Sequence, residues 1–69
     1  NQNYQFALHF LGMAYQLNNQ DADLCYYIAV VYRDFAKFGN PKAQKIQEYE
    51  NNSKNFFQQA AALDPKYAK

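Results

Sequence analysis

Apolar positions recur every three or four residues along most of this chain, and short polar segments interrupt the pattern twice. This period is typical of amphipathic helices that bury one face. It predicts three helices, at about residues 4–18, 22–38 and 41–63. Only two glycines and two prolines break the chain, and Val and Ile together number four, with no Thr. Such a composition disfavours a sheet, so the expected fold class is all-α.

The first predicted helix has a broad apolar face and a polar end. Leu8 and Tyr15 widen its main stripe, whereas Phe10 lies outside it. The polar run from Asn18 to Asp21 ends the helix, because short Asn and Asp side chains bond the backbone at helix ends. The main stripe consists of Ala7, Leu11, Ala14 and Leu17.

The second predicted helix is apolar nearly all round, which indicates that it is covered on more than one side. Asp21 is its expected N-cap, and Asp23 lies in the first turn, where the helix dipole favours negative charge. Lys37 stands in the last turn, and Gly39 is the expected C′ residue just beyond the helix. The main stripe consists of Cys25, Ile28, Ala29, Tyr32, Phe35 and Ala36.

The third predicted helix starts with Asn40 as its N-cap and Pro41 at its first helical position. Its middle, residues 48–55, is thinly apolar, so we expect high exposure there. Pro65 ends the helix, because the residue before a proline avoids the α region. The stripe of this helix consists of Ala43, Ile46, Tyr49, Ser53, Phe56, Phe57, Ala60 and Leu63.

Composition excludes several classes of function. With 69 residues the chain is at most one small domain, and a net charge of +1 is too low for a surface that binds nucleic acid. The longest apolar run, Leu24–Tyr32, has nine residues and is far short of a membrane span. A lone cysteine excludes an internal disulfide. We therefore expect no nucleic acid, membrane, metal or cofactor.

Catalytic chemistry is not expected either. A free cysteine on a helix stripe, such as Cys25, is most often a small buried hydrophobe. No second metal ligand follows His9 at helical spacing. The neighbouring acids Asp21 and Asp23 are two residues apart, so on a helix they point to different sides and form no carboxylate pair. The sequence predicts a protein that is not an enzyme.

The last stretch carries the most specific motif. Phe57-x-x-Ala60-x-x-Leu63-Asp64-Pro65 resembles the end of the second helix of a tetratricopeptide repeat. The first helix has the same skeleton, from Ala7 to Leu17. The second helix, with Cys25-x-x-Ile28-Ala29-x-x-Tyr32, is similar to the first helix of that repeat. The chain thus resembles one and a half repeats, with Tyr67–Lys69 starting a further helix.

A second register is also open, because Leu11-Gly12-x-x-Tyr15 matches the first-helix signature literally. Residues 20–38 would then be a second helix without a closing proline. In the preferred register, 46 positions separate Asn19 from Pro65, against a family period of about 34. The repeat is therefore expected to have an elongated helical hairpin.

The resemblance implies antiparallel helical hairpins in a right-handed α-solenoid, with residues 1–69 as one unit of a longer array. The small residues would let helices approach closely, and the large ones would fill the space between layers. The absence of an initiating Met also indicates a fragment. The repeat-packing residues would be Ala7, Leu11, Ala14, Leu17, Cys25, Ile28, Ala29, Tyr32, Phe57, Ala60, Leu63 and Pro65.

The resemblance also implies a peptide-binding groove on the second helix. Its side chains would be Asp23, Tyr26, Tyr27, Val30 and Arg33. Family members that hold a peptide carboxylate use Lys, Arg and Asn at the matching places, so this chain departs from the carboxylate-clamp type. An aromatic shelf with one arginine would suit an apolar or Pro-containing segment. Alternatively, the tyrosines pack against a neighbouring repeat.

We therefore expect a scaffold or adaptor segment for protein–protein interaction, with a protein or peptide partner. Two alternatives stay open: a structural segment that self-associates or docks on adjacent repeats, and a substrate-recruiting repeat module of a larger enzyme. Phe6, Phe10 or Tyr15 would form an exposed apolar patch at the open end. The sequence names no compartment, and the lack of a targeting segment favours the cytoplasm.

Overall fold

The computed structural model describes residues 3–68, and these form three α-helices and a short 3-10 helix. The helices are α1 (Tyr4–Leu17), α2 (Ala22–Phe38) and α3 (Ala43–Leu63), followed by η1 (Pro65–Tyr67). Residues 3–68 contain no strand, so the predicted all-α class with three packed helices is confirmed. Of the further helix predicted at 67–69, Tyr67 closes η1, and Lys69 lies outside the described residues.

Local signals define the first two helices. The α1 helix ends at Leu17, and the Asn18 backbone N–H still bonds the Ala14 carbonyl at 3.0 Å. At the start of α2, the Asp21 side chain accepts a hydrogen bond from the Leu24 N–H at 3.2 Å. This is the N-cap that the sequence predicts, and such a cap typically contributes about 1 kcal/mol.

The connection between α2 and α3 differs from the prediction. Gly39 has right-handed angles, and the left-handed residue is Asn40, with φ of 57°. An N-cap needs extended angles, so Asn40 cannot cap α3. Lys42 occupies the N-cap position without a side-chain hydrogen bond. The α3 helix therefore begins at Ala43, two residues later than predicted. Asn tolerates the left-handed region better than most residues.

Gly39 is needed here because of a close approach and not because of its backbone angles. A Cβ atom at this position would lie 2.3 Å from the Phe35 ring and 2.7 Å from the Phe35 carbonyl oxygen. Any larger residue would have to push the ring or the backbone away. The glycine lets the chain turn directly over Phe35, which is only 7% exposed.

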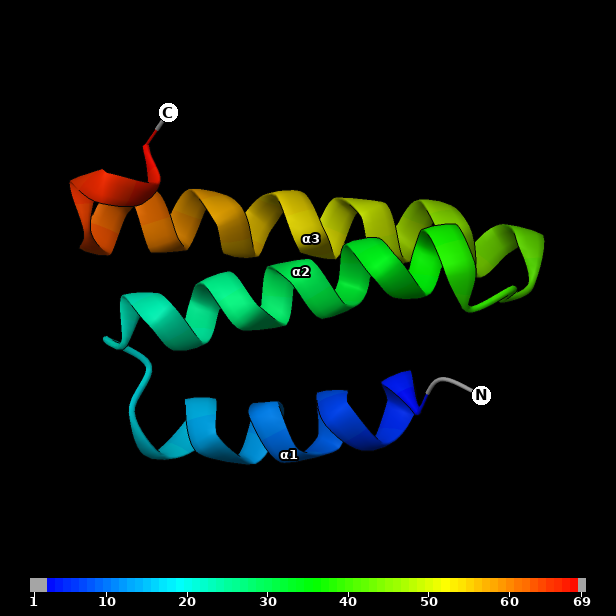
Figure 1. Cartoon of the computed structure of the whole chain (residues 1–69), viewed down its shortest axis with the longest axis horizontal. Helices are drawn as coiled ribbons and strands as arrows, with labels where there is room; N and C mark the ends of the chain where they lie inside the picture. Colours follow the sequence, from blue (N-terminus) through cyan, green and yellow to red (C-terminus); the bar gives the residue numbers. More distant parts are fainter. Residues whose placement is uncertain (1–2, 69) are drawn as a thin grey trace.

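The three helices run antiparallel to their neighbours in the chain, with α2 between α1 and α3 (Figure 1). Because α2 is covered on both sides, it supplies most of the core, as its nearly continuous apolar surface predicts. No residue of α1 is fully buried. The buried residues are Cys25, Ile28, Ala29 and Phe35 of α2, and Ser53 and Ala60 of α3.

Small side chains lie between α2 and α3. Ala29 and Ala60 are both 0% exposed, and Ser53 is 5% exposed. The Ser53 hydroxyl donates a hydrogen bond to the Ala29 carbonyl oxygen at 2.8 Å. A buried hydroxyl is tolerated only when it is bonded, and this bond joins the two helices directly. The polar middle of α3 is otherwise largely exposed, as predicted.

A series of aromatic rings connects all three helices. Phe35 stacks on Tyr4 of α1, with ring centres 5.3 Å apart, and on Tyr49 of α3, at 4.5 Å. At the other end of α1, Tyr15 meets Phe56 edge to face at 5.4 Å. Such pairs are worth roughly 0.5–1.5 kcal/mol each beyond their area burial. These ring contacts hold α1 against the α2–α3 hairpin, although α1 itself has no fully buried residue.

Candidate interaction surfaces

The predicted groove residues lie on α2, and η1 covers part of them. Tyr26 stacks on Tyr67 of η1 with ring centres 4.8 Å apart, and it meets Phe57 of α3 at 5.6 Å. The Tyr26 side chain is half-buried in this cluster. Tyr26 therefore packs on α3 and η1 of its own chain, and packing of the tyrosines against a neighbouring repeat stays a prediction.

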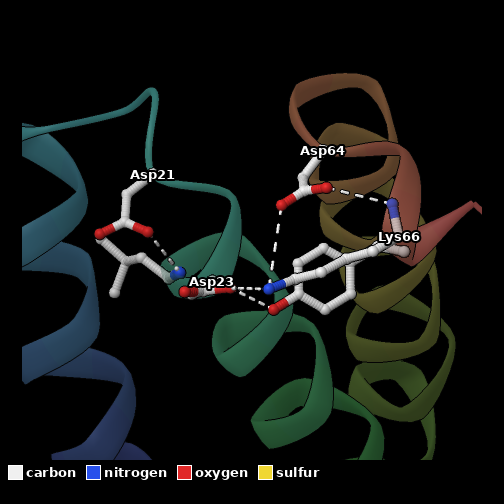
Figure 2. A network of polar contacts seen from close by, with 6 residues as sticks. Asp21, Asp23, Asp64 and Lys66 are labelled. Atoms are coloured by element: carbon white, nitrogen blue, oxygen red, sulfur yellow. Dashed lines mark hydrogen bonds and ion pairs between the residues drawn. The ribbon is translucent and has the colours of Figure 1, made fainter.

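A polar network fastens η1 to the first turn of α2 (Figure 2). The Tyr67 hydroxyl donates a hydrogen bond to the Asp23 carboxylate. The Lys66 ammonium lies 3.5 Å from the same Asp23 oxygen and 3.9 Å from Asp64. Asp64 in turn accepts the Lys66 backbone N–H at 3.1 Å. Asp23 is therefore occupied by the chain itself.

The network shifts the pKa values of two groups. The hydrogen bond from Tyr67, helped by the charge of Lys66, lowers the pKa of Asp23 below its usual value. The same hydrogen bond raises the pKa of Tyr67 to about 12, because the carboxylate favours the protonated phenol. The Asp23 and Lys66 side chains are each 60% exposed, so salt weakens their charge interaction.

The rest of the predicted groove face stays open. Tyr27 is 59% exposed, and its ring packs edge-on against Tyr26. Val30 is half-buried. The Arg33 guanidinium lies 5.9 Å from the centre of the Phe57 ring, and its Nε atom is 3.5 Å from Asp34. The open part is therefore an aromatic and cationic edge along α2 and not a deep groove.

A larger apolar surface lies on the outer side of α1, which we call the α1 outer stripe. Its four side chains are Phe6 (54% exposed), Phe10 (59%), Met13 (53%) and Leu17 (90%). They recur at intervals of four, three and four residues, so they share one side of the helix. Apart from His9, α1 carries none of the readily charged side chains: it has no Asp, Glu, Lys or Arg.

Sequence reasoning found this surface only in part. Phe6 and Phe10 are exposed as expected, but Tyr15 points toward α3, where its hydroxyl donates to the Gln59 side chain at 2.7 Å. Leu17 was assigned to packing between layers and is open to solvent here. Met13 was not singled out, although the four-three-four spacing with Phe6, Phe10 and Leu17 was available as a signal.

The predicted repeat-packing residues fall into three groups by burial. Cys25, Ile28, Ala29 and Ala60 are fully buried. A second group is half-buried: Ala7, Leu11, Ala14, Tyr32 and Phe57. The third group faces solvent: Leu17, Leu63 and Pro65. The burial of both alanines fits a close approach of α2 and α3. Packing between repeats stays a prediction.

A shallow cleft of about 430 Å³ opens at the turn between α2 and α3. Its lining includes the aromatic rings of Phe35 and Tyr49 and the basic side chains of Lys42 and Lys45. Lys45 forms an ion pair with Glu48, whose carboxylate raises the pKa of the ammonium group. Lys42 and Lys45 are both exposed and give this cleft a solvated basic edge.

Chemistry at a site depends on the surroundings of a reactive group such as Cys25 and on the grouping of possible metal ligands. Cys25 is fully buried, and burial raises the pKa of its thiol, which disfavours the nucleophilic thiolate. Residues 3–68 contain no group of three or more His, Cys, Asp or Glu side chains that could hold a metal ion. Within the same residues, no helix has the length and apolarity to cross a membrane.

The chain matches no family model, no curated protein and no solved structure. The structure establishes a small all-α unit of three packed helices, and assignment to the tetratricopeptide repeats stays a proposal.

Proposed function

We propose that this chain is a protein–protein interaction segment, a scaffold or adaptor without chemistry of its own. The α1 outer stripe carries the proposal. Judged from their exposed fractions, its four side chains present roughly 500 Å² of apolar surface, within the range of patches that mark binding sites. Such an area is unfavourable in water, and a partner helix would remove it.

The tetratricopeptide-like arrangement supports this function. Three antiparallel helices with buried alanines between α2 and α3, and a proline that follows the Asp64 C-cap of α3, suit one and a half repeats of a right-handed solenoid. In such an array each helical layer covers the next. The α1 outer stripe would then be the side on which another layer docks.

A second surface is favoured by one observation. Tyr27 is exposed beside the stacked rings of Tyr26 and Tyr67, with Val30 and Arg33 further along the same helix. Aromatic side chains supply large contact area at low entropic cost. This edge suits an apolar or Pro-containing peptide, while Asp23 serves to hold η1 in place.

The two alternative roles make different demands on the same surfaces. A structural segment would use the α1 outer stripe to bind a further repeat or a second copy of the chain. It would not need Tyr27 for binding a partner. A recruiting module of a larger enzyme would use the Tyr27 edge, with catalysis elsewhere in the parent protein.

Site-specific photo-crosslinking separates these surfaces. A benzophenone side chain is introduced in place of Met13, of Tyr27 or, as a control on the polar side of α1, of Gln16. In extract of the source cells we expect strong crosslinks to polypeptide from position 13 and weak ones from position 16. Equal yields from positions 13 and 16 would overturn the assignment of the α1 outer stripe.

A further inference from the structure

The spacing of the α1 outer stripe reads the same in both directions along the helix. Phe6, Phe10, Met13 and Leu17 are separated by four, three and four residues. From this symmetry we propose that the stripe binds the same stripe of a second copy of this chain, antiparallel about a two-fold axis. This inference rests on the interaction role proposed for the α1 outer stripe, and it selects as partner the second copy that the structural alternative also allows.

The symmetry fixes the contacts. An axis between positions 11 and 12 places Phe10 of one copy against Met13 of the other, and Phe6 against Leu17. Spacings of four and three are those of the a and d positions in coiled coils, where side chains interlock. An aromatic ring beside a thioether is a favourable pair. Every contact is made twice, as a two-fold interface requires.

The charges of α1 also suit a second copy. The helix has no Asp, Glu, Lys or Arg, so two identical faces meet without repulsion. The antiparallel orientation is preferred because opposed helix dipoles attract. It also keeps apart the two Asp21 carboxylates that follow the ends of the helices, which a parallel pair would bring together.

The available area is small for a protein interface. Two stripes of roughly 500 Å² together bury about 1,000 Å², at the lower limit for a specific interface. We therefore expect a reversible dimer with a dissociation constant on the order of 10 µM. Met13 and Leu17 would lose their exposure on pairing.

The test uses the purified chain and three variants in sedimentation experiments at concentrations on both sides of the expected dissociation constant. The unaltered chain should form dimers reversibly, and so should the control Gln16→Glu. Phe10→Glu alone and Met13→Lys alone should each weaken pairing by about 100-fold or more, because each buries unpaired charges twice. An equimolar mixture of the two variants should form dimers again, because the introduced acid and base then face each other.

Three results would overturn the inference: a monomer at all concentrations, a dimer unchanged by Phe10→Glu, or a mixture that stays monomeric. Helical content by circular dichroism shows whether each variant folds. If a variant unfolds alone, its helix should return in the mixture. The proposed function is tested separately. If the chain is monomeric but is crosslinked through position 13 to a different protein, the dimer is refuted and the interaction role of the α1 outer stripe is retained.

Discussion

The α1 and α2 helices both consist mostly of apolar residues, but α2 packs within the α2–α3 hairpin whereas α1 packs at its side. Among residues 3–68, every fully buried residue belongs to the hairpin, where small side chains and the Ser53–Ala29 hydrogen bond join the two helices. In α1 no residue is fully buried. It is held by aromatic rings on one side and exposes four large apolar residues on the other.

The difference shows that apolar content by itself does not place a helix in a core. An α-helix buries what its neighbours cover, and α1 has neighbours on one side only. The same composition that makes α2 a core helix makes α1 an edge helix with a free face. Substitutions in the hairpin should therefore change stability, whereas those on the α1 outer stripe should change association.

The largest effect is expected where the two regions meet, at Phe35. Phe35→Ala removes a buried ring that stacks on both Tyr4 and Tyr49. We expect a loss of about 3–5 kcal/mol in the free energy of unfolding, measured by urea denaturation. Phe38→Ala is the matched control, because Phe38 is 67% exposed, and it should change stability by less than about 0.5 kcal/mol. Equal losses would contradict the placement of Phe35 in the core.

The close approach within the hairpin is tested by overpacking. Ala60→Phe places a ring where no space is left, and it should lower stability by about 1–3 kcal/mol. Ala62→Phe, on the exposed side of the same turn, serves as the control. A melting curve that does not move for Ala60→Phe would show that Ala60 is not at the contact, and the repeat register would then be wrong.

The network at η1 predicts a pH dependence. The raised pKa of Tyr67 means that the folded chain holds the phenol proton more tightly than the unfolded chain. The Tyr67–Asp23 hydrogen bond therefore stabilises the folded chain fully below about pH 10, and this stabilisation is lost as the pH rises toward about 12. The lowered pKa of Asp23 acts at the other end: its contribution is present above about pH 4 and is lost as the pH falls.

Thermal melts of the unaltered chain and Tyr67→Phe across this range isolate the effect, because the other tyrosines titrate in both proteins. The difference in melting temperature between the two should shrink from pH 9 to pH 12. Added salt should reduce the share of this melting-temperature difference that comes from the charge of Lys66. A constant difference would exclude the Tyr67–Asp23 bond as its source.

The smallest effect on stability is expected on the α1 outer stripe. At concentrations that keep the chain monomeric, Leu17→Ser should change the free energy of unfolding by less than about 0.5 kcal/mol. Leu11 is half-buried on the same helix, so Leu11→Ser should lower the free energy of unfolding by more than Leu17→Ser does. Denaturant titrations of both variants compare the two sides, and a similar loss for both would remove the distinction between a packed and a free face.

Much of the fold could be predicted because its signals are local. Asp21 caps α2 through its own side chain, and the polar residues after Leu17 and the proline after Asp64 end their helices within a turn. The start of α3 was wrong by two residues. The error arose because the close approach of Gly39 to Phe35 lies outside any local rule, and Asn40 takes the left-handed angles instead.

The candidate surfaces were less predictable. Asp23 and Tyr26 were assigned to a groove because they lie on the right side of α2, but the pattern did not show that η1 folds back onto them. Leu17 belongs to a good apolar stripe and is nevertheless exposed. A spacing rule identifies which residues share a side of a helix, and it does not identify what stands opposite that side.

The sequence by itself determined that the chain is helical and, to within two residues, where each helix begins and ends, because caps, prolines and apolar period act over a few residues. Only the tertiary structure decided which apolar side each helix buries. That choice depends on how many neighbours a helix has: α2 has two, so Ala29 and Cys25 lose all contact with water. The α1 helix has neighbours on one side only, so Phe10 and Met13 remain in contact with water.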